Sequence, residues 1–151
     1  MVELRKIDNP FVVKVSREFE ASAERVFDAW IDPINVGKWL FGTPDGKNKV
    51  CEVDARVGGH FRIGERRGDE MAMHVGTYHE IDRPQRLVFS YYFETANEEM
   101  PSNVIVEMSE TENGCMVLVT HEMDDIYAEY EDSATNGWNM IFDGLEKVLG
   151  K

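Results

Sequence analysis

Two side chains that could hold a polar ligand occupy positions where the sequence otherwise places apolar ones. Residues 11–20 alternate between apolar and polar side chains, which predicts a strand with Arg17 as the exception on its apolar face. His121 follows Val117 and Val119 on the apolar face of a later strand. A charged or titratable group on a buried face needs a partner. Each is therefore a polar handle of a binding pocket or, equally well, part of a structural pair with a nearby carboxylate.

The histidines and cysteines form no recognisable metal or catalytic motif. The four histidines are His60, His74, His79 and His121. No pair of them has the spacing of a helical zinc site, and none flanks a cysteine pair. His74 and His79 are an odd number of residues apart on one strand, so they should point to opposite faces. A nucleophile motif such as G-x-S-x-G is missing. We expect no cofactor, no metal and no catalytic residue, with a composite metal site from several strands as the minor alternative.

Two segments resemble functional loops only in part. Residues 42–47 (GTPDGK) are one residue short of a phosphate-binding loop, and Asn48 stands where Ser or Thr would bind magnesium, which predicts a turn. Residues 122–132 hold six acidic side chains but lack the residue order of a calcium loop. We expect this acidic segment to be a solvated loop that leads into the last helix.

Composition and charge exclude several classes of protein. The 151 residues are 42% hydrophobic with a net charge of −13, which predicts a single domain over residues 1–151. After residue 86 the only basic side chains are Lys147 and Lys151, against about half of the 29 acidic ones. Such a surface repels phosphate backbones, so we expect no nucleic-acid partner. No apolar run approaches the roughly 18 residues of a membrane span, and no signal peptide is present, which predicts a cytoplasmic protein.

Hydrophobic periodicity predicts the elements that position these residues. Ser22 is a good N-cap for a helix with apolar residues at i, i+3, i+4 and i+7, and Asp32-Pro33 begins a second short helix through Leu40. Strands and turns then predict three hairpins, with strands over residues 48–56 and 60–67, 71–82 and 86–94, and 102–110 and 115–123. An apolar stripe from Trp138 to Leu149 predicts a final helix that packs on the sheet.

The order β-α-α-β(six)-α predicts an α+β fold in which a long, curved antiparallel sheet wraps around the last helix. That geometry often leaves an apolar cavity lined by aromatic side chains. The expected ligand-binding residues are Arg17, Trp39, Phe61, Tyr78, Phe89, Tyr91, His121, Trp138 and Phe142. A bulge after Gly76 would exchange Tyr78 with His79. Gly137 lies inside the last helix, where glycine is less stable than alanine. A close approach to the sheet, or the mouth of a pocket, would explain why glycine occurs there.

Five segments occur in a familiar order: SAERVFDAWIDPINVGKW, GGHFRI, GTYHEIDRPQRLVFSYYF, NGCMVLVTHE and GWNMIFDGLEKVL. Together they resemble the heat-shock-protein-90 ATPase activator-homologue family, within the START-like (SRPBCC, polyketide-cyclase/Bet v-like) superfamily. The resemblance covers residues 11–149 and implies a helix-grip fold. It implies a stress-related protein that binds a small hydrophobic or amphipathic molecule. A chaperone-associated interaction protein is the second reading, and a cyclase- or hydrolase-type enzyme the third.

Overall fold

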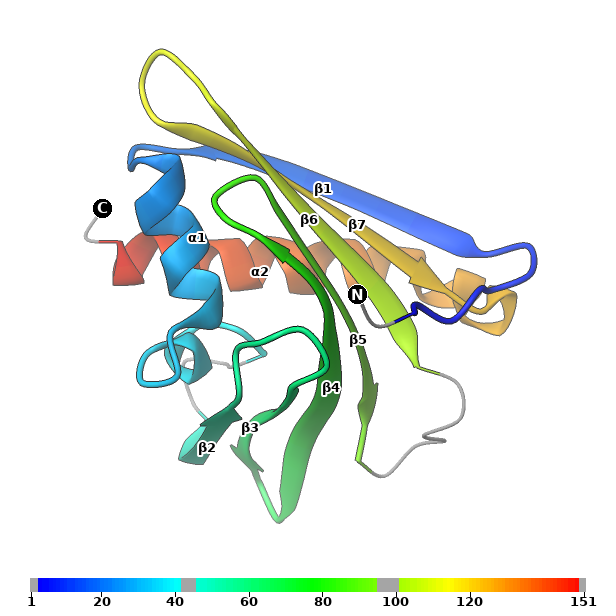
Figure 1. Ribbon diagram of the computed structural model, residues 1–151. Helices are drawn as coiled ribbons and strands as arrows, with labels where there is room; N and C mark the ends of the chain where they lie inside the picture. Colours follow the sequence, from blue (N-terminus) through cyan, green and yellow to red (C-terminus); the bar gives the residue numbers. More distant parts are fainter. Residues whose placement is uncertain (1–2, 42–45, 95–100, 150–151) are drawn as a thin grey trace.

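A computed structural model describes residues 3–41, 46–94 and 101–149 and shows a curved antiparallel sheet of seven strands (Figure 1). The strand order is β1-β7-β6-β5-β4-β3-β2, so the first strand pairs with the last and every other strand pairs with its neighbour in sequence. The strands are β1 (Phe11–Phe19), β2 (Lys47–Val53), β3 (His60–Arg67), β4 (Glu70–Asp82), β5 (Arg86–Phe93), β6 (Ser102–Glu110) and β7 (Cys115–Met123).

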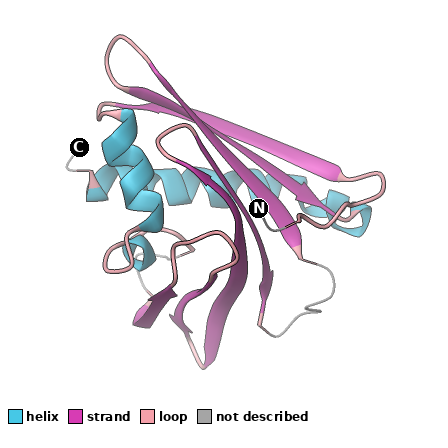
Figure 2. Cartoon of the chain, viewed as in Figure 1, coloured by secondary structure: helices cyan, strands magenta, loops and turns pink. Residues whose placement is uncertain are grey.

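Two α-helices complete the helix-grip fold that the sequence predicts. The long helix α2 (Glu131–Val148) runs across one face of the sheet, and the shorter α1 (Ala23–Ile31) lies beside it (Figure 2). Two 3-10 helices, η1 (Val36–Lys38) and η2 (Asp125–Tyr130), precede β2 and α2. Within the described ranges, no helix is long and apolar enough to cross a membrane.

Alternation along the strands supplies the apolar face that α2 covers. In β7, every second side chain from Cys115 to Met123 is buried, and His121 is one of them. The stripe of α2 buries Trp138, Phe142 and Leu145 on this face. Full burial of a large apolar side chain contributes about 1.5–3 kcal/mol. The same alternation therefore stabilises the fold and carries His121 into the interior.

The segment between α1 and β2 departs from the predicted second helix. In its described part this segment forms the short η1, and Gly37 lets η1 approach β2 closely, since an added Cβ would lie 2.8 Å from Cβ of Cys51. Phe41 then adopts a positive φ of 58°, a left-handed conformation that bulky residues rarely take. Of the turn expected over residues 42–47, residues 42–45 lie outside the described ranges, and Lys47 is the first residue of β2.

Two further expectations need correction. A Cβ added at Gly137 would meet nothing within 4 Å, so no close approach to the sheet explains this glycine. The close approach lies at Gly144, where an added Cβ would be 3.1 Å from Cβ of Trp39. Residues 125–130 are exposed, as expected of a solvated segment, but they form η2 instead of an irregular loop, and α2 starts at Glu131.

The two edges of the sheet differ. Strand β1 pairs with β7 without interruption over nine residues. Strand β2 is shorter, and its register with β3 shifts between Lys47 and Val50. Its side chains at Lys47 and Lys49 are exposed. One edge is thus regular and the other is short, irregular and basic.

Candidate ligand-binding site

Aromatic rings from four strands and α2 form a continuous set of contacts on the face of the sheet that α2 covers. Phe61 lies 5.4 Å from both Tyr78 and Phe89, measured between ring centroids. Phe89 then contacts Tyr91 at 6.4 Å. Tyr91 contacts His121 at 5.6 Å, and His121 contacts Trp138 at 5.8 Å. We call this set the interior aromatic cluster; its members among the predicted site residues are Phe61, Tyr78, Phe89, Tyr91, His121 and Trp138.

Trp39 joins the cluster through Trp30, a core residue that is not among the expected ligand-binding residues. Trp30 of α1 meets Trp39 edge-to-face at 4.7 Å and lies 6.3 Å from Trp138. Gly144 of α2 makes room for Trp39, as its close approach shows. The helix α1 thereby closes one end of the interior.

The bulge in β4 leaves Tyr78 in the cluster. The register between β4 and β5 shifts between Tyr78 and Glu80, so the extra residue is His79. Tyr78 is buried against Phe61, whereas Nε2 of His79 lies 2.8 Å from Oγ of Ser90. Tyr78 and His79 have not exchanged places. Since the residues alternate from His74 through Gly76 to Tyr78, His74 faces the interior.

Phe41 and His74 belong to the cluster although sequence analysis did not assign them to it. Their rings stack in parallel with centroids 4.1 Å apart, and Phe41 also lies 4.8 Å from Tyr91. The alternation that contains Tyr78 would have placed His74 on the inner face. Phe41 gave no periodic signal, because its ring reaches the interior through the left-handed backbone conformation.

His121 has one satisfied and one unsatisfied ring nitrogen. The indole Nε1 of Trp138 donates a hydrogen bond to Nδ1 of His121 at 3.1 Å. Nε2 of His121 is buried and has no hydrogen-bond partner among the described residues. Burial lowers the pKa of His121 to about 4, so the ring is neutral at pH 7.

The polar groups next to His121 are also neutral. Burial, with the Arg67 guanidinium as a smaller cause, lowers the pKa of His74 to about 4, and its buried Nδ1 has no partner in the described part of the chain. Burial raises the pKa of the Tyr91 phenol. Both histidine pKa values move away from pH 7, the reverse of what a general base requires. The arrangement offers hydrogen bonds to a ligand rather than proton transfer.

Arg17 and Phe142 lie in a separate group of contacts. The guanidinium of Arg17 donates to Asp143 at 2.8 Å and to Glu146 at 3.0 Å, both on α2. It also lies 5.5 Å above the ring of Phe142, which packs edge-to-face on Phe19. This geometry is that of the structural pair with nearby carboxylates. Across the described ranges, no three His, Cys, Asp or Glu side chains are grouped so that they could hold a metal ion.

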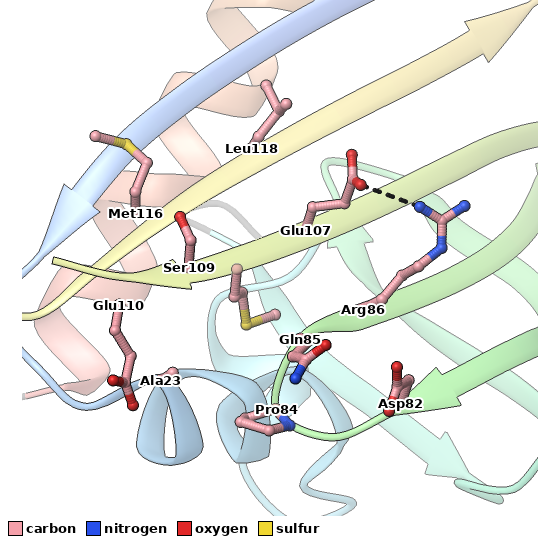
Figure 3. A pocket seen from close by; sticks show the side chains of 11 residues that line it. Ala23, Asp82, Pro84, Gln85, Arg86, Glu107, Ser109, Glu110, Met116 and Leu118 are labelled. Carbon is pink, nitrogen blue, oxygen red and sulfur yellow. Dashed lines mark hydrogen bonds and ion pairs between the residues drawn. The ribbon is translucent and has the colours of Figure 1, made fainter.

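A hollow of about 780 Å³ lies on the other face of the sheet, beside the β4–β5 turn and the start of α1 (Figure 3). We call it the outer groove. Its lining is Ala23, Asp82, Pro84, Gln85, Arg86, Glu107, Met108, Ser109, Glu110, Met116 and Leu118. Arg86 donates to Glu107 at 3.0 Å and to Glu80 at 3.3 Å, so its charge is already paired. None of the lining residues has a buried side-chain polar atom without a partner in the part of the chain described. The interior aromatic cluster is therefore the stronger candidate.

The curved sheet closed around α2 is the helix-grip architecture of START-like proteins. Within that class, residues 20–150 match the family model described as activator of Hsp90 ATPase homolog 1-like protein, and the chain belongs to this family. The match agrees with the resemblance seen in the sequence. A search of curated proteins found no match.

Solved structures share the fold across nearly the whole chain. Protein CV1439 from Chromobacterium violaceum has a TM-score of 0.76 at 22% identity, over 92% of this chain and 97% of that one. Protein NE0264 from Nitrosomonas europaea has a TM-score of 0.76 at 18% identity, over 95% and 96%. CalU16 from Micromonospora echinospora has a TM-score of 0.68 at 22% identity, over 93% and 77%. At these identities the likeness shows the fold alone.

Proposed function

We propose that this protein binds a small, largely apolar molecule between the sheet and α2, at the interior aromatic cluster. Family membership supports a domain of the ligand-binding type. The observation that carries it is the buried Nε2 of His121, which has no partner among the described residues although aromatic rings surround it. Ligand sites typically combine an aromatic lining with a few polar groups that orient the ligand.

The ring contacts explain why the bound molecule should be mainly apolar. Phe41, Tyr91 and Trp138 present large aromatic surfaces near His121. The polar groups among them are neutral at pH 7, because burial disfavours their charged forms. It lowers the pKa values of His74 and His121 and raises that of Tyr91. A neutral polar site suits an uncharged ligand, since a buried charge needs a partner of opposite sign.

Native mass spectrometry of the freshly purified protein tests this function by detecting a small molecule that co-purifies with it. Titration with an apolar fluorescent probe then locates the site. We expect one probe per chain, weaker binding in Tyr91→Ala, and unchanged binding in the matched control Leu118→Ala, which changes the outer groove. Loss of binding in Leu118→Ala alone would move the site to the outer groove. Absence of saturable binding would contradict the proposal.

A specific surface feature favours a second function, association with a chaperone of the Hsp90 type that the family description names. Ile126 and Tyr130 of η2 are 63% and 54% exposed within the acidic segment, and Tyr127 beside them is 37% exposed. Exposed apolar side chains in a group mark protein interfaces. Asp124 at the start of this segment pairs with Arg5 at 2.8 Å, which ties the segment to the N-terminal part of the chain.

Calorimetric titration with a purified Hsp90 tests this second function. The double substitution of Ile126→Ser and Tyr130→Ser should abolish binding if η2 is the contact. Ile34→Ser is the matched control, because Ile34 is 78% exposed elsewhere on the surface. Equal binding by wild type and the double variant would exclude η2 as the interface, and no binding by any of them would exclude the association.

A further inference from the structure

The hydrogen bond between Trp138 and His121 determines which nitrogen of His121 carries the proton. An indole N–H is only a donor, so the Nδ1 atom that it contacts at 3.1 Å must be an unprotonated acceptor. Because the ring is neutral at pH 7, its single proton resides on Nε2. Trp138 is thus a positioning residue for His121: its hydrogen bond fixes the tautomer and holds the orientation of the ring.

The group left without a partner is therefore a donor. Nε2–H of His121 is buried, and no acceptor among the described residues reaches it. The indole Nε1 of Trp30, a second buried donor next to Trp138, also has no partner among them. A buried N–H without an acceptor costs free energy that a ligand or a water molecule can recover. The interior thus contains buried N–H donors that a ligand acceptor can satisfy.

An anionic ligand end fits this site poorly. Arg17, the one charged residue among the expected ligand-binding residues, is already paired with Asp143 and Glu146. Arg67, whose charge acts on His74, is paired with the buried Glu65 at 2.8 Å. A carboxylate at His121 would thus have to be desolvated against a neutral donor, with both of these cations already paired. An uncharged oxygen acceptor is satisfied by one N–H at far smaller desolvation cost.

We propose that the ligand of the interior site is an uncharged molecule that presents a carbonyl-type oxygen to Nε2–H of His121. Its apolar body packs on Phe41, Tyr91 and Trp138. This inference rests on the proposed binding function and adds the chemical class of the ligand: neutral ketones, esters, lactones or quinones with an apolar skeleton. Carboxylates, ammonium compounds and pure hydrocarbons of the same shape are disfavoured.

The tautomer is tested directly by nitrogen-15 NMR of the histidine rings in the intact protein. We expect His121 to give the cross-peak pattern of the Nε2–H tautomer at pH 7. In Trp138→Phe the donor to Nδ1 is gone, so the signal should shift toward a mixture of tautomers. His60, which is exposed, serves as an internal reference in the same spectrum. A protonated Nδ1 or a charged ring at pH 7 in the wild type would overturn the proposal.

Ligand chemistry is tested with 2-acetylnaphthalene and 2-isopropylnaphthalene, which have nearly the same shape and differ in the carbonyl oxygen. The ratio of their dissociation constants is measured in wild type, in His121→Phe and in the control His60→Phe. Comparing ratios cancels the difference in their hydration. We expect the wild type and the control to favour the acetyl compound by about three- to tenfold relative to His121→Phe, the effect of one neutral hydrogen bond.

The outcomes separate this inference from the proposed function. If neither compound binds, the proposed function fails and the inference fails with it. If both bind and the ratio is the same in wild type and His121→Phe, the function stands and the inference is wrong. The expected tautomer together with an unchanged ratio would show that the ligand oxygen does not accept a hydrogen bond from Nε2–H, which also overturns the inference.

Discussion

Arg17 and His121 face α2 from neighbouring strands, β1 and β7, yet the structure treats their polar atoms in opposite ways. Arg17 keeps 24% of its side chain exposed and forms ion pairs with Asp143 and Glu146. His121 is 5% exposed and has a single hydrogen bond, from Trp138, with its other nitrogen unused. The guanidinium of Arg17 finds its partners within the fold, whereas Nε2 of His121 has no partner among the described residues and can bond to a ligand.

The difference shows that a polar residue on a buried face is not by itself a sign of function. Both residues interrupt an apolar alternation, so both qualify equally as polar handles. Only the partners distinguish them: at Arg17 the carboxylates of α2 satisfy the guanidinium, whereas at His121 the indole satisfies one nitrogen and fixes the proton on the other. An unsatisfied buried donor is costly enough to need an explanation, and a ligand provides one.

The largest expected effect tests whether Trp138, next to His121, and Phe142, next to Arg17, belong to one core. Trp138→Ala and Phe142→Ala should each lower the free energy of unfolding by about 3–5 kcal/mol, because both side chains are almost fully buried. Met140→Ala is the control on the exposed side of the same helix and should change it by no more than about 0.5 kcal/mol. Urea denaturation measures all three. Near-wild-type stability of either large truncation would show that the truncated side chain is peripheral to the core.

The next effect separates the two regions by pH. The folded-state pKa of His121 is about 4, below the value near 6.5 of the unfolded chain, so the unfolded state binds a proton that the folded state does not. The contribution of neutral His121 to the free energy of unfolding is therefore fully present above about pH 6.5 and is lost as the pH falls toward 4. Between pH 7 and pH 5 the wild type should therefore lose about 2 kcal/mol more than His121→Leu.

Unfolding free energies at the two pH values provide the measurement. Shared carboxylate effects cancel, since both proteins carry the same acidic residues. Equal losses in wild type and His121→Leu would mean that His121 is accessible to protons in the folded state, and the contrast with Arg17 would disappear.

A smaller effect is expected at Arg17. Arg17→Met keeps much of the apolar stem and removes the ion pairs, which should lower stability by about 1 kcal/mol at low salt. The loss should shrink in 1 M salt, because these partly exposed charges are screened. Lys14→Met is the matched control on the exposed face of β1. A salt-independent loss would indicate that packing on Phe142, rather than charge, is the main contribution.

The smallest effect concerns the helix that carries both regions. Gly137→Ala should stabilise the protein by about 0.5–1 kcal/mol, because the new methyl group meets open space and alanine favours a helix. Gly144→Ala is the contrasting variant, since its methyl group would press on Trp39 at 3.1 Å. Thermal melting measures both. A loss of stability in Gly137→Ala would show that the glycine serves a purpose other than the packing described.

Periodicity was sufficient to predict the fold, because alternation in the strands and the stripe of α2 are local properties of the sequence. It also placed Tyr91, His121 and Trp138 on facing surfaces. It could not show that the ring of Phe41 enters the interior, since that depends on one left-handed residue in an aperiodic segment. Nor could it assign the partners of Arg17, which lie more than 120 residues away and depend on the rotation of α2 about its axis.

The unequal edges of the sheet have a consequence for self-association. An open sheet can grow by pairing its edge strands with those of other copies, and charged, short or irregular edge strands prevent this. Strand β2 has exposed Lys47 and Lys49 and a shifted register, so it is a poor template. Strand β1 is regular over nine residues and could align with another β1. Continuous growth needs two competent edges, so strand pairing between copies would stop at a pair instead of extending into a fibre.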